Sequence, residues 1–236
     1  MKIAVSQIKL SSQIEENLKK IIRLSKKASE QGVEILCFPE CALTGYLRDF
    51  TKLDYGRTER ALTYLQSFAK KEKINLIVGS PVIKNKKVFN SAVVLLKNGK
   101  QLLYYKRHLT EFDKKYFSAG KRSLSFKVKS VKCGVAVCRD QNYPEIFENY
   151  KKAGAKIVFI LAAHYYLPKE AELKKEKNKA LPVKRALDNK MFVAKAGAVG
   201  KIEDKVSFGH SLIASPRGFM IKEAGRAEET VLISKI

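Results

Sequence analysis

Strand-like and helix-like segments alternate along this chain of 236 residues, and no other feature constrains its fold as strongly. Apolar residues 2–8 precede a segment at 13–31 with helical periodicity, which Gly32 is placed to end. Asn98-Gly99, a strong hairpin signal, separates strand-like segments at 92–96 and 101–105. Chains that alternate in this way form α/β folds, here with some antiparallel pairing. The other expected elements are strands at 33–38, 76–79, 131–137, 157–161, 191–196, 208–214 and 230–234, and helices at 58–72, 144–154 and 182–189.

Local signals refine this expectation. Ser12 and Glu15 have the spacing of a capping box at the start of the first helix. The charged segment 169–179 is expected to be exposed, with Pro182 beginning a separate short helix. No internal repeat, low-complexity linker or domain boundary is visible, so residues 1–236 are expected to form a single domain.

The composition favours a folded, cytoplasmic protein. Hydrophobic residues make up 45% of the chain, which is enough for a sizeable core. No apolar run approaches the ~20 residues that span a bilayer. The first residues lead directly into a strand, without a leader that resembles a signal peptide. We therefore expect a cytoplasmic location and no membrane partner.

The formal net charge of +24 raises the alternative of nucleic-acid binding. Lysines outnumber arginines, however, whereas phosphate recognition favours the arginine fork. The basic residues are also spread along the whole chain, many of them beside glutamates. These patterns favour a solvated, lysine-rich surface over polyanion binding, which stays open as an alternative. Nucleic acid is therefore not an expected partner.

The chain has four cysteines, at positions 37, 41, 133 and 138. Disulfides are rare in cytosolic proteins. Zinc sites built from four cysteines use close pairs on turns, whereas Cys37 and Cys133 lie inside apolar strand-like runs. Both are expected in the core, and no metal site is expected. Cys41, next to Glu40, stays a candidate for a reactive thiol.

Glu40, Lys106 and Cys138 each directly follow an apolar strand-like segment. Ligands gather beyond the carboxyl ends of strands in α/β sheets, so these side chains define a candidate site. Glu40 is placed to deprotonate the thiol, which is mostly protonated at neutral pH. Lys106 and the backbone N–H of Arg139 are candidates to hold a developing oxyanion. Singly, each side chain has a structural alternative: Glu40 as a turn cap, Lys106 as a surface lysine and Cys138 as a core residue.

At these residues the chain resembles the nitrilase superfamily of carbon–nitrogen hydrolases, and the resemblance covers nearly the whole chain. Residues 38–46 resemble the family's FPE-x-x-LTGY block, residues 104–109 its Y-x-K-x-HL block, and residues 133–145 its G-x-x-x-C-x-D…PE block. Residues 185–189 resemble its RA-x-E-N helix, and residues 208–218 its G-H-S…P-x-G strand and turn. Five blocks in the correct order and spacing are a specific signal.

The resemblance implies a four-layer αββα sandwich, assembled as a homodimer or a larger homo-oligomer, and a mechanism without metal or cofactor. In that mechanism Glu40 deprotonates Cys138, and the thiolate attacks the substrate carbon. Lys106 and the Arg139 amide hold the tetrahedral oxyanion. Ammonia or an amine leaves, and water activated by Glu40 hydrolyses the thioester.

The chain departs from the family pattern at three positions. Many members carry a second glutamate after the lysine block, where this chain has Asp113, with Glu111 nearby. A shorter acid reaches the lysine through water or tunes it less well, so Asp113 is a possible second acid. Asp188 also stands where glutamate is usual. Arg139 replaces a usual Tyr or Trp; its side chain either binds an acidic substrate group or pairs with Asp140, and the structural pair is slightly favoured.

Tyr46, His164 and Tyr165 are candidate substrate-pocket residues, and plain packing explains the last two about equally well. Variable loops form the pocket walls in this family, here expected at 47–57, 107–122 and 164–182. The leading hypothesis is an amidase that acts on a small linear amide, ω-amide or N-carbamoyl compound. Nitrile hydrolysis ranks second. A family member that has lost catalysis is a third alternative, and a basic nucleic-acid-associated protein, supported by charge alone, is a fourth.

Overall fold

The computed structural model describes residues 1–236, and its strands belong to one curled sheet. The strands are β1 (Lys2–Lys9), β2 (Ile35–Cys37), β3 (Asn75–Lys84), β4 (Lys87–Leu95), β5 (Gln101–Tyr105), β6 (Ser125–Val128), β7 (Val131–Val137), β8 (Ile157–Ala162), β9 (Phe192–Ile202), β10 (Lys205–Phe208), β11 (Leu212–Ala214), β12 (Met220–Glu223) and β13 (Thr230–Lys235). The helices are α1 (Ile14–Glu30), α2 (Tyr55–Lys71), α3 (Glu111–Lys114), α4 (Pro144–Lys152) and α5 (Pro168–Asn189), with short 3-10 turns η1 (Phe50–Lys52) and η2 (Cys138–Asn142).

The sheet runs in the order β5-β4-β3-β2-β1-β9-β8-β7-β6, and β1 joins its two halves. The start of β1 pairs in parallel with β2, and its last two residues pair in parallel with β9. The hairpins β3–β4, β4–β5 and β6–β7 add antiparallel pairs at both ends. The predicted α/β fold with mixed pairing, including the hairpin at Asn98-Gly99, is therefore confirmed.

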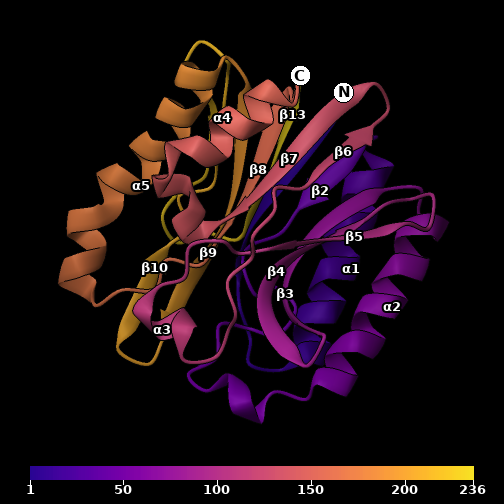
Figure 1. Ribbon diagram of the computed structural model, residues 1–236, viewed down its shortest axis with the longest axis vertical. Coiled ribbons are helices and arrows are strands. Elements are labelled where there is room, and N and C mark those ends of the chain that lie inside the picture. Colours follow the sequence, from indigo (N-terminus) through magenta and orange to yellow (C-terminus); the bar gives the residue numbers. More distant parts are fainter.

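Apolar side chains fill three cores, which define four layers. The inner core joins the two halves of the sheet and includes Ile77, Tyr104, Val135 and Phe159. α1 and α2 cover the outer face of the first half. α4 and α5 cover the outer face of the second half. Figure 1 shows the two helix pairs on opposite sides of the strands. The arrangement is the expected αββα sandwich.

The start of α1 differs from the prediction. Its N-cap is Gln13, which makes no side-chain cap, so the predicted capping box of Ser12 and Glu15 is wrong. Asn17 provides the polar contacts instead: its amide group bonds the backbone N–H of Ser11 at 2.9 Å and the Ser11 carbonyl at 2.7 Å. A buried asparagine inside the helix thus fixes the chain that enters it.

α5 corrects a second expectation. The segment 169–179 is exposed or partly exposed, as expected, apart from the buried Ala171 and Asn178, but it forms the first half of α5 and does not precede a separate helix. Pro182 lies inside the helix and lacks the N–H that would bond the Asn178 carbonyl one turn earlier. Lys195 Nζ donates to that carbonyl at 2.8 Å. A side chain from β9 thus replaces the missing backbone donor, and the helix continues through the proline.

Two further differences concern strand lengths. β9 extends to Ile202, beyond the predicted end at residue 196, and turns back into β10, so residues 202–205 form a hairpin that was not predicted. β6 and β12 were not predicted. None of the helices is both long and apolar enough to span a bilayer.

Candidate active site

The three predicted side chains follow the carboxyl ends of β2, β5 and β7, and the curled sheet brings these ends to one place. Lys106 Nζ lies 2.6 Å from Glu40 Oε1. Lys106 and Cys138 line the same cavity. All three residues are buried. The structure therefore brings Glu40, Lys106 and Cys138 together.

Asp113 belongs to this cluster through direct contact. Its Oδ2 lies 2.8 Å from Lys106 Nζ, and neither side chain is more than 1% exposed. A capping box on α3 holds the carboxylate: Thr110 N donates to Asp113 Oδ2 at 2.9 Å, and Asp113 N donates to Thr110 Oγ1 at 3.0 Å. Tyr46 OH donates to the other oxygen at 3.4 Å. Asp113 is shorter than the usual glutamate but contacts Lys106 without a bridging water, because α3 places its carboxylate next to the lysine.

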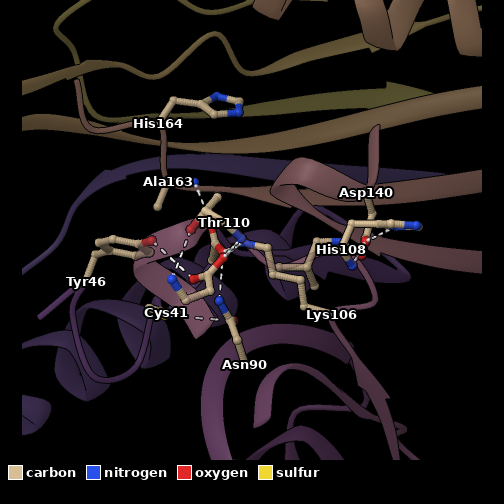
Figure 2. A network of polar contacts seen from close by, with 12 residues as sticks. Cys41, Tyr46, Asn90, Lys106, His108, Thr110, Asp140, Ala163 and His164 are labelled. Atoms are coloured by element: carbon tan, nitrogen blue, oxygen red, sulfur yellow. Dashed lines mark hydrogen bonds and ion pairs between the residues drawn. The ribbon is translucent and has the colours of Figure 1, made fainter. Parts of the chain in front are cut away.

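Two neutral donors orient Glu40. Asn90 Nδ2 donates to Oε1 at 2.8 Å, and the backbone N–H of Ala163 donates to Oε2 at 3.1 Å. Figure 2 shows Asn90 and Ala163 approaching the network from opposite sides, with Lys106 extending into it. Gly79 lies against the same turn, where an added Cβ would meet Glu40 Cα at 2.7 Å. Packing and hydrogen bonds therefore fix this carboxylate in place.

Cys138 occupies a sharp turn between β7 and η2. Its φ of +48° lies in the left-handed region, which is costly for a residue other than glycine. Asp140 holds the turn by accepting from the backbone N–H of Val137 at 3.1 Å. Strain of this kind persists where the surroundings fix it, and it is common at catalytic nucleophiles.

The Asp140 carboxylate also fixes the segment around Lys106. It accepts from the hydroxyl of Tyr104 at 2.8 Å and from the backbone N–H groups of Arg107 and His108 at 3.2 and 2.9 Å. His108 Nδ1 lies 3.1 Å from the same carboxylate. One buried acid thus joins the lysine strand end to the cysteine turn, a role that the sequence analysis missed.

Burial and charge set the protonation of the cluster. Burial raises the pKa of Glu40, although Lys106 opposes this effect. Burial alone would lower the pKa of Lys106, but Glu40, Cys138 and Asp113 raise it well above its usual value. Burial also opposes ionisation of Asp113, but Lys106 and Thr110 lower its pKa overall. Burial and the charge of Glu40 raise the pKa of Cys138, so its resting form is the thiol.

A cavity of about 470 Å³ opens above Lys106 and Cys138. Tyr46, His164 and Tyr165 all line it, as expected for pocket residues. Of the expected wall loops, residues 47–57 contribute only Leu47 and Arg48. The hairpin at 202–205, which sequence reasoning missed, forms another part of the wall.

The remaining predicted residues lie outside the cavity. Arg139 makes no ion pair with Asp140, whose oxygens are already occupied, so the favoured salt bridge is wrong. The buried Nε of Arg139 has no partner.

Asp188 pairs with Lys184 near the surface. Cys37 and Cys133 are core residues, as expected, and Cys41 is a buried free thiol next to Glu40.

Comparisons with known proteins agree with this geometry. Residues 2–236 match the family described as carbon-nitrogen hydrolase. A protein from Bacillus subtilis named 2-oxoglutaramate amidase is 32% identical over 92% of this chain and 83% of its own length. A protein from Pyrococcus abyssi named nitrilase is 29% identical over 99% of this chain and 89% of its own length. A solved amidase of the nitrilase superfamily from Nesterenkonia AN1 is 23% identical, with a TM-score of 0.89 over 99% of this chain and 89% of that one, and shares the fold. The chain therefore belongs to the carbon-nitrogen hydrolase family.

Proposed function

We propose that this protein is an amidase that hydrolyses a small linear amide or ω-amide through a thioester on Cys138. The observation that carries the proposal is the buried Lys106, held between Glu40 and Asp113 at the floor of a cavity that Cys138 also lines. The name of the Bacillus subtilis relative, which refers to an amide substrate, supports the amide over a nitrile.

The first half of the reaction forms the thioester. Glu40 takes the proton from Cys138, and its raised pKa makes it a better base than an ordinary carboxylate. The sulfur adds to the amide carbon, and the carbonyl oxygen becomes an oxyanion beside the Lys106 ammonium and the Arg139 N–H. When the C–N bond breaks, Glu40 returns the proton to the departing nitrogen, so ammonia or an amine leaves as a neutral molecule.

The second half consumes one water. Glu40 accepts a proton from the water as its oxygen attacks the thioester carbon, and the same two donors hold the second oxyanion. The C–S bond breaks, and the proton on Glu40 returns to the sulfur of Cys138. The products are a carboxylic acid and the resting thiol. In both halves Asp113 keeps Lys106 charged and aligned.

The test is ammonia release from a panel of small amides, N-carbamoyl compounds and nitriles. We expect Cys138→Ala to lower the rate on the best amide at least about 10³-fold, and substrate to leave an acyl mass on the Cys138 peptide of the wild type. Cys133→Ala is the matched control, because this core cysteine lies outside the cavity. Equal rates for the wild type and Cys138→Ala would refute the nucleophile. A panel in which only nitriles react would replace the amidase by a nitrilase.

We further propose that residues 1–236 act as one catalytic domain, in the cytoplasm and as a homodimer or larger homo-oligomer. The four free cysteines fit a reducing compartment. Exposed apolar residues on α5 and around β12 support self-association, namely Leu187, Phe219, Met220 and Ile221. Light scattering of the wild type and Phe219→Glu tests the assembly. A monomeric wild type at micromolar concentration would exclude it.

A further inference from the structure

Five lysines lie together where β7 and β8 begin, in a part of the molecule that the proposed reaction does not use. The backbone N–H of Lys156 donates to the Lys132 carbonyl at 2.8 Å, and Lys127 is aligned with Lys132 in the β6–β7 hairpin. The Lys132 ammonium donates to the carbonyl of the residue that caps α4, next to Lys151 and Lys152. We call these five residues the lysine cluster. Four of them are exposed, and Lys132 is half-buried.

The lysine cluster lies away from the cavity. Lys132 and Cys138 belong to opposite ends of β7, about 20 Å apart at roughly 3.3 Å per residue. None of the five lysines lines the cavity. Figure 1 shows the β6–β7 hairpin at the end of the molecule opposite α3, which carries Asp113. A ligand on the cluster would therefore leave the cavity open.

The ammonium groups of the cluster form no ion pair. Other surface lysines do: Lys114, Lys175 and Lys184 each lie within 3.0 Å of a carboxylate. The difference follows from the sequence, because residues 114–139 and 149–169 contain neither Asp nor Glu. The balanced, solvated surface that is typical of lysine-rich chains therefore does not extend to this cluster.

A structural role accounts for part of the cluster. Lys151 and Lys152 lie in the last turn of α4, where the helix dipole favours positive charge. Lys132 bonds the carbonyl at the end of the same helix. Neither reason applies to Lys127 and Lys156, which lie outside the helix and whose ammonium groups donate no hydrogen bond. Helix capping thus leaves two exposed, unpaired charges without an explanation.

The surroundings of the cluster indicate which anion it fits. Lysine ammonium groups bind phosphates as point charges. The segments that carry the cluster expose no large apolar side chain, whereas stable attachment to a membrane takes an apolar anchor besides charge. They also expose no aromatic ring on which an unpaired base could stack. Charge without apolar or aromatic contacts is suited to the phosphate backbone of a duplex, whose recognition carries no sequence information.

We propose that the lysine cluster binds the phosphate backbone of a double-stranded nucleic acid without sequence preference. Nucleic acid was not an expected partner, because the basic residues are spread along the sequence, but the fold gathers these five and leaves them unpaired. The formal net charge of +24 adds a long-range attraction for the same partner. The inference does not depend on the amidase function, since the two sites lie at opposite ends of β7.

The experiment measures binding of a fluorescent DNA duplex of about 20 base pairs by anisotropy, from about 50 to about 200 mM salt. If four or five phosphates are neutralised, the logarithm of affinity falls with that of salt with a slope of about −4. The triple variant Lys127→Gln, Lys151→Gln, Lys156→Gln is expected to flatten this slope by about 2 to 3, and to weaken binding at low salt at least about 10-fold.

A second triple variant is the matched control. Lys114→Gln, Lys175→Gln, Lys184→Gln removes the same net charge, but from lysines that are paired with carboxylates. We expect it to weaken binding less than about 3-fold. Circular dichroism and ammonia release, both expected to be unchanged in the cluster variant, show that it is folded. If it does not fold, Lys156→Gln alone takes its place, with a slope flatter by about 1.

Two outcomes overturn the proposal. An equal loss of binding in both triple variants would mean that the total charge of the chain, and not the cluster, attracts the duplex. A wild type that binds no duplex at about 50 mM salt would exclude the partner. If that wild type instead sediments with phosphatidylserine vesicles, the cluster is a membrane site and the duplex is the wrong partner. None of these results bears on Cys138, so the amidase stands or falls by its own test.

Discussion

Replacing Asp140 by asparagine tests whether one buried carboxylate holds the catalytic segments together. Its Oδ1 accepts from the backbone N–H groups of Arg107 and His108, and its Oδ2 accepts from Val137 N–H and Tyr104 OH. An asparagine must place its NH₂ group at one of these positions. An NH₂ group at the position of Oδ1 would face two backbone N–H donors, those of Arg107 and His108. At the position of Oδ2 it would face one, the N–H of Val137, because the Tyr104 hydroxyl is able to rotate and accept from the NH₂ group.

The magnitude follows from this count. In the better orientation one buried N–H loses its acceptor, which costs about 1–3 kcal/mol. The remaining hydrogen bonds become weaker, because their acceptor is no longer charged. A hydrogen bond to a charged group contributes about 1.5–3 kcal/mol, whereas one between neutral groups contributes about 1 kcal/mol. We therefore expect Asp140→Asn to lower the free energy of unfolding by about 3 kcal/mol. That is a large part of the roughly 5–15 kcal/mol that stabilises a typical protein.

Urea unfolding followed by far-UV circular dichroism measures this loss, since the chain contains no tryptophan for fluorescence. Protein concentration is kept fixed, so that assembly does not shift the midpoint. Asp188→Asn is the control, because this carboxylate is 38% exposed and its loss is expected to cost less than about 1 kcal/mol. If Asp140→Asn is no less stable than Asp188→Asn, the carboxylate does not hold the two segments.

Three further predictions concern the site and its surroundings. Asp113→Asn removes a carboxylate that raises the pKa of Lys106, so the alkaline limb of the kcat–pH profile is expected to move to lower pH. An unchanged alkaline limb would show that Asp113 does not keep Lys106 charged during the reaction. Gly79→Ala places a Cβ 2.2 Å from the Pro39 carbonyl oxygen, and the forced shift of Glu40 is expected to lower kcat more than about 10-fold, with circular dichroism as the check on folding. The pKa of Lys195 is about 7 in the fold against 10.5 unfolded, so the unfolded chain binds more protons between these values and wild-type stability rises with pH there. Methionine does not titrate, so the free energy of unfolding of the wild type is expected to rise by about 2 kcal/mol relative to that of Lys195→Met between pH 7 and pH 9, as measured by urea unfolding. A difference that does not change with pH would contradict the lowered pKa of Lys195.

Sequence patterns predicted the parts of the site that local order determines. Glu40, Lys106 and Cys138 follow apolar strands, and the rule that ligands gather at strand ends selects them without a structure. Asp113 was predicted only through the resemblance to a family in which many members carry a second glutamate after the lysine block. Its direct contact with the lysine depends on the capping turn of α3, and the sequence analysis did not foresee that turn.

The residues that orient the site were harder to predict, because their partners are distant in sequence. Asn90 and the Ala163 amide reach Glu40 from 50 and 123 residues away. A polar residue inside the apolar run of β4 was the available signal for Asn90, whereas a backbone N–H leaves no signal at all. Pro182 was wrongly predicted to begin a separate helix for a similar reason. The donor that satisfies the Asn178 carbonyl and lets α5 continue comes from Lys195 on β9, which is distant in sequence.

The protonated resting state of Cys138 affects how the protein tolerates oxidants. Peroxide attacks thiolates much faster than thiols, and a cysteine activated by an imidazolium is ionised even without substrate. Here burial and the charge of Glu40 raise the pKa of the thiol, so the empty enzyme offers little thiolate. The sulfur becomes nucleophilic only when its proton passes to Glu40 during attack. A nucleophile that rests as the thiol reacts slowly with peroxide between turnovers.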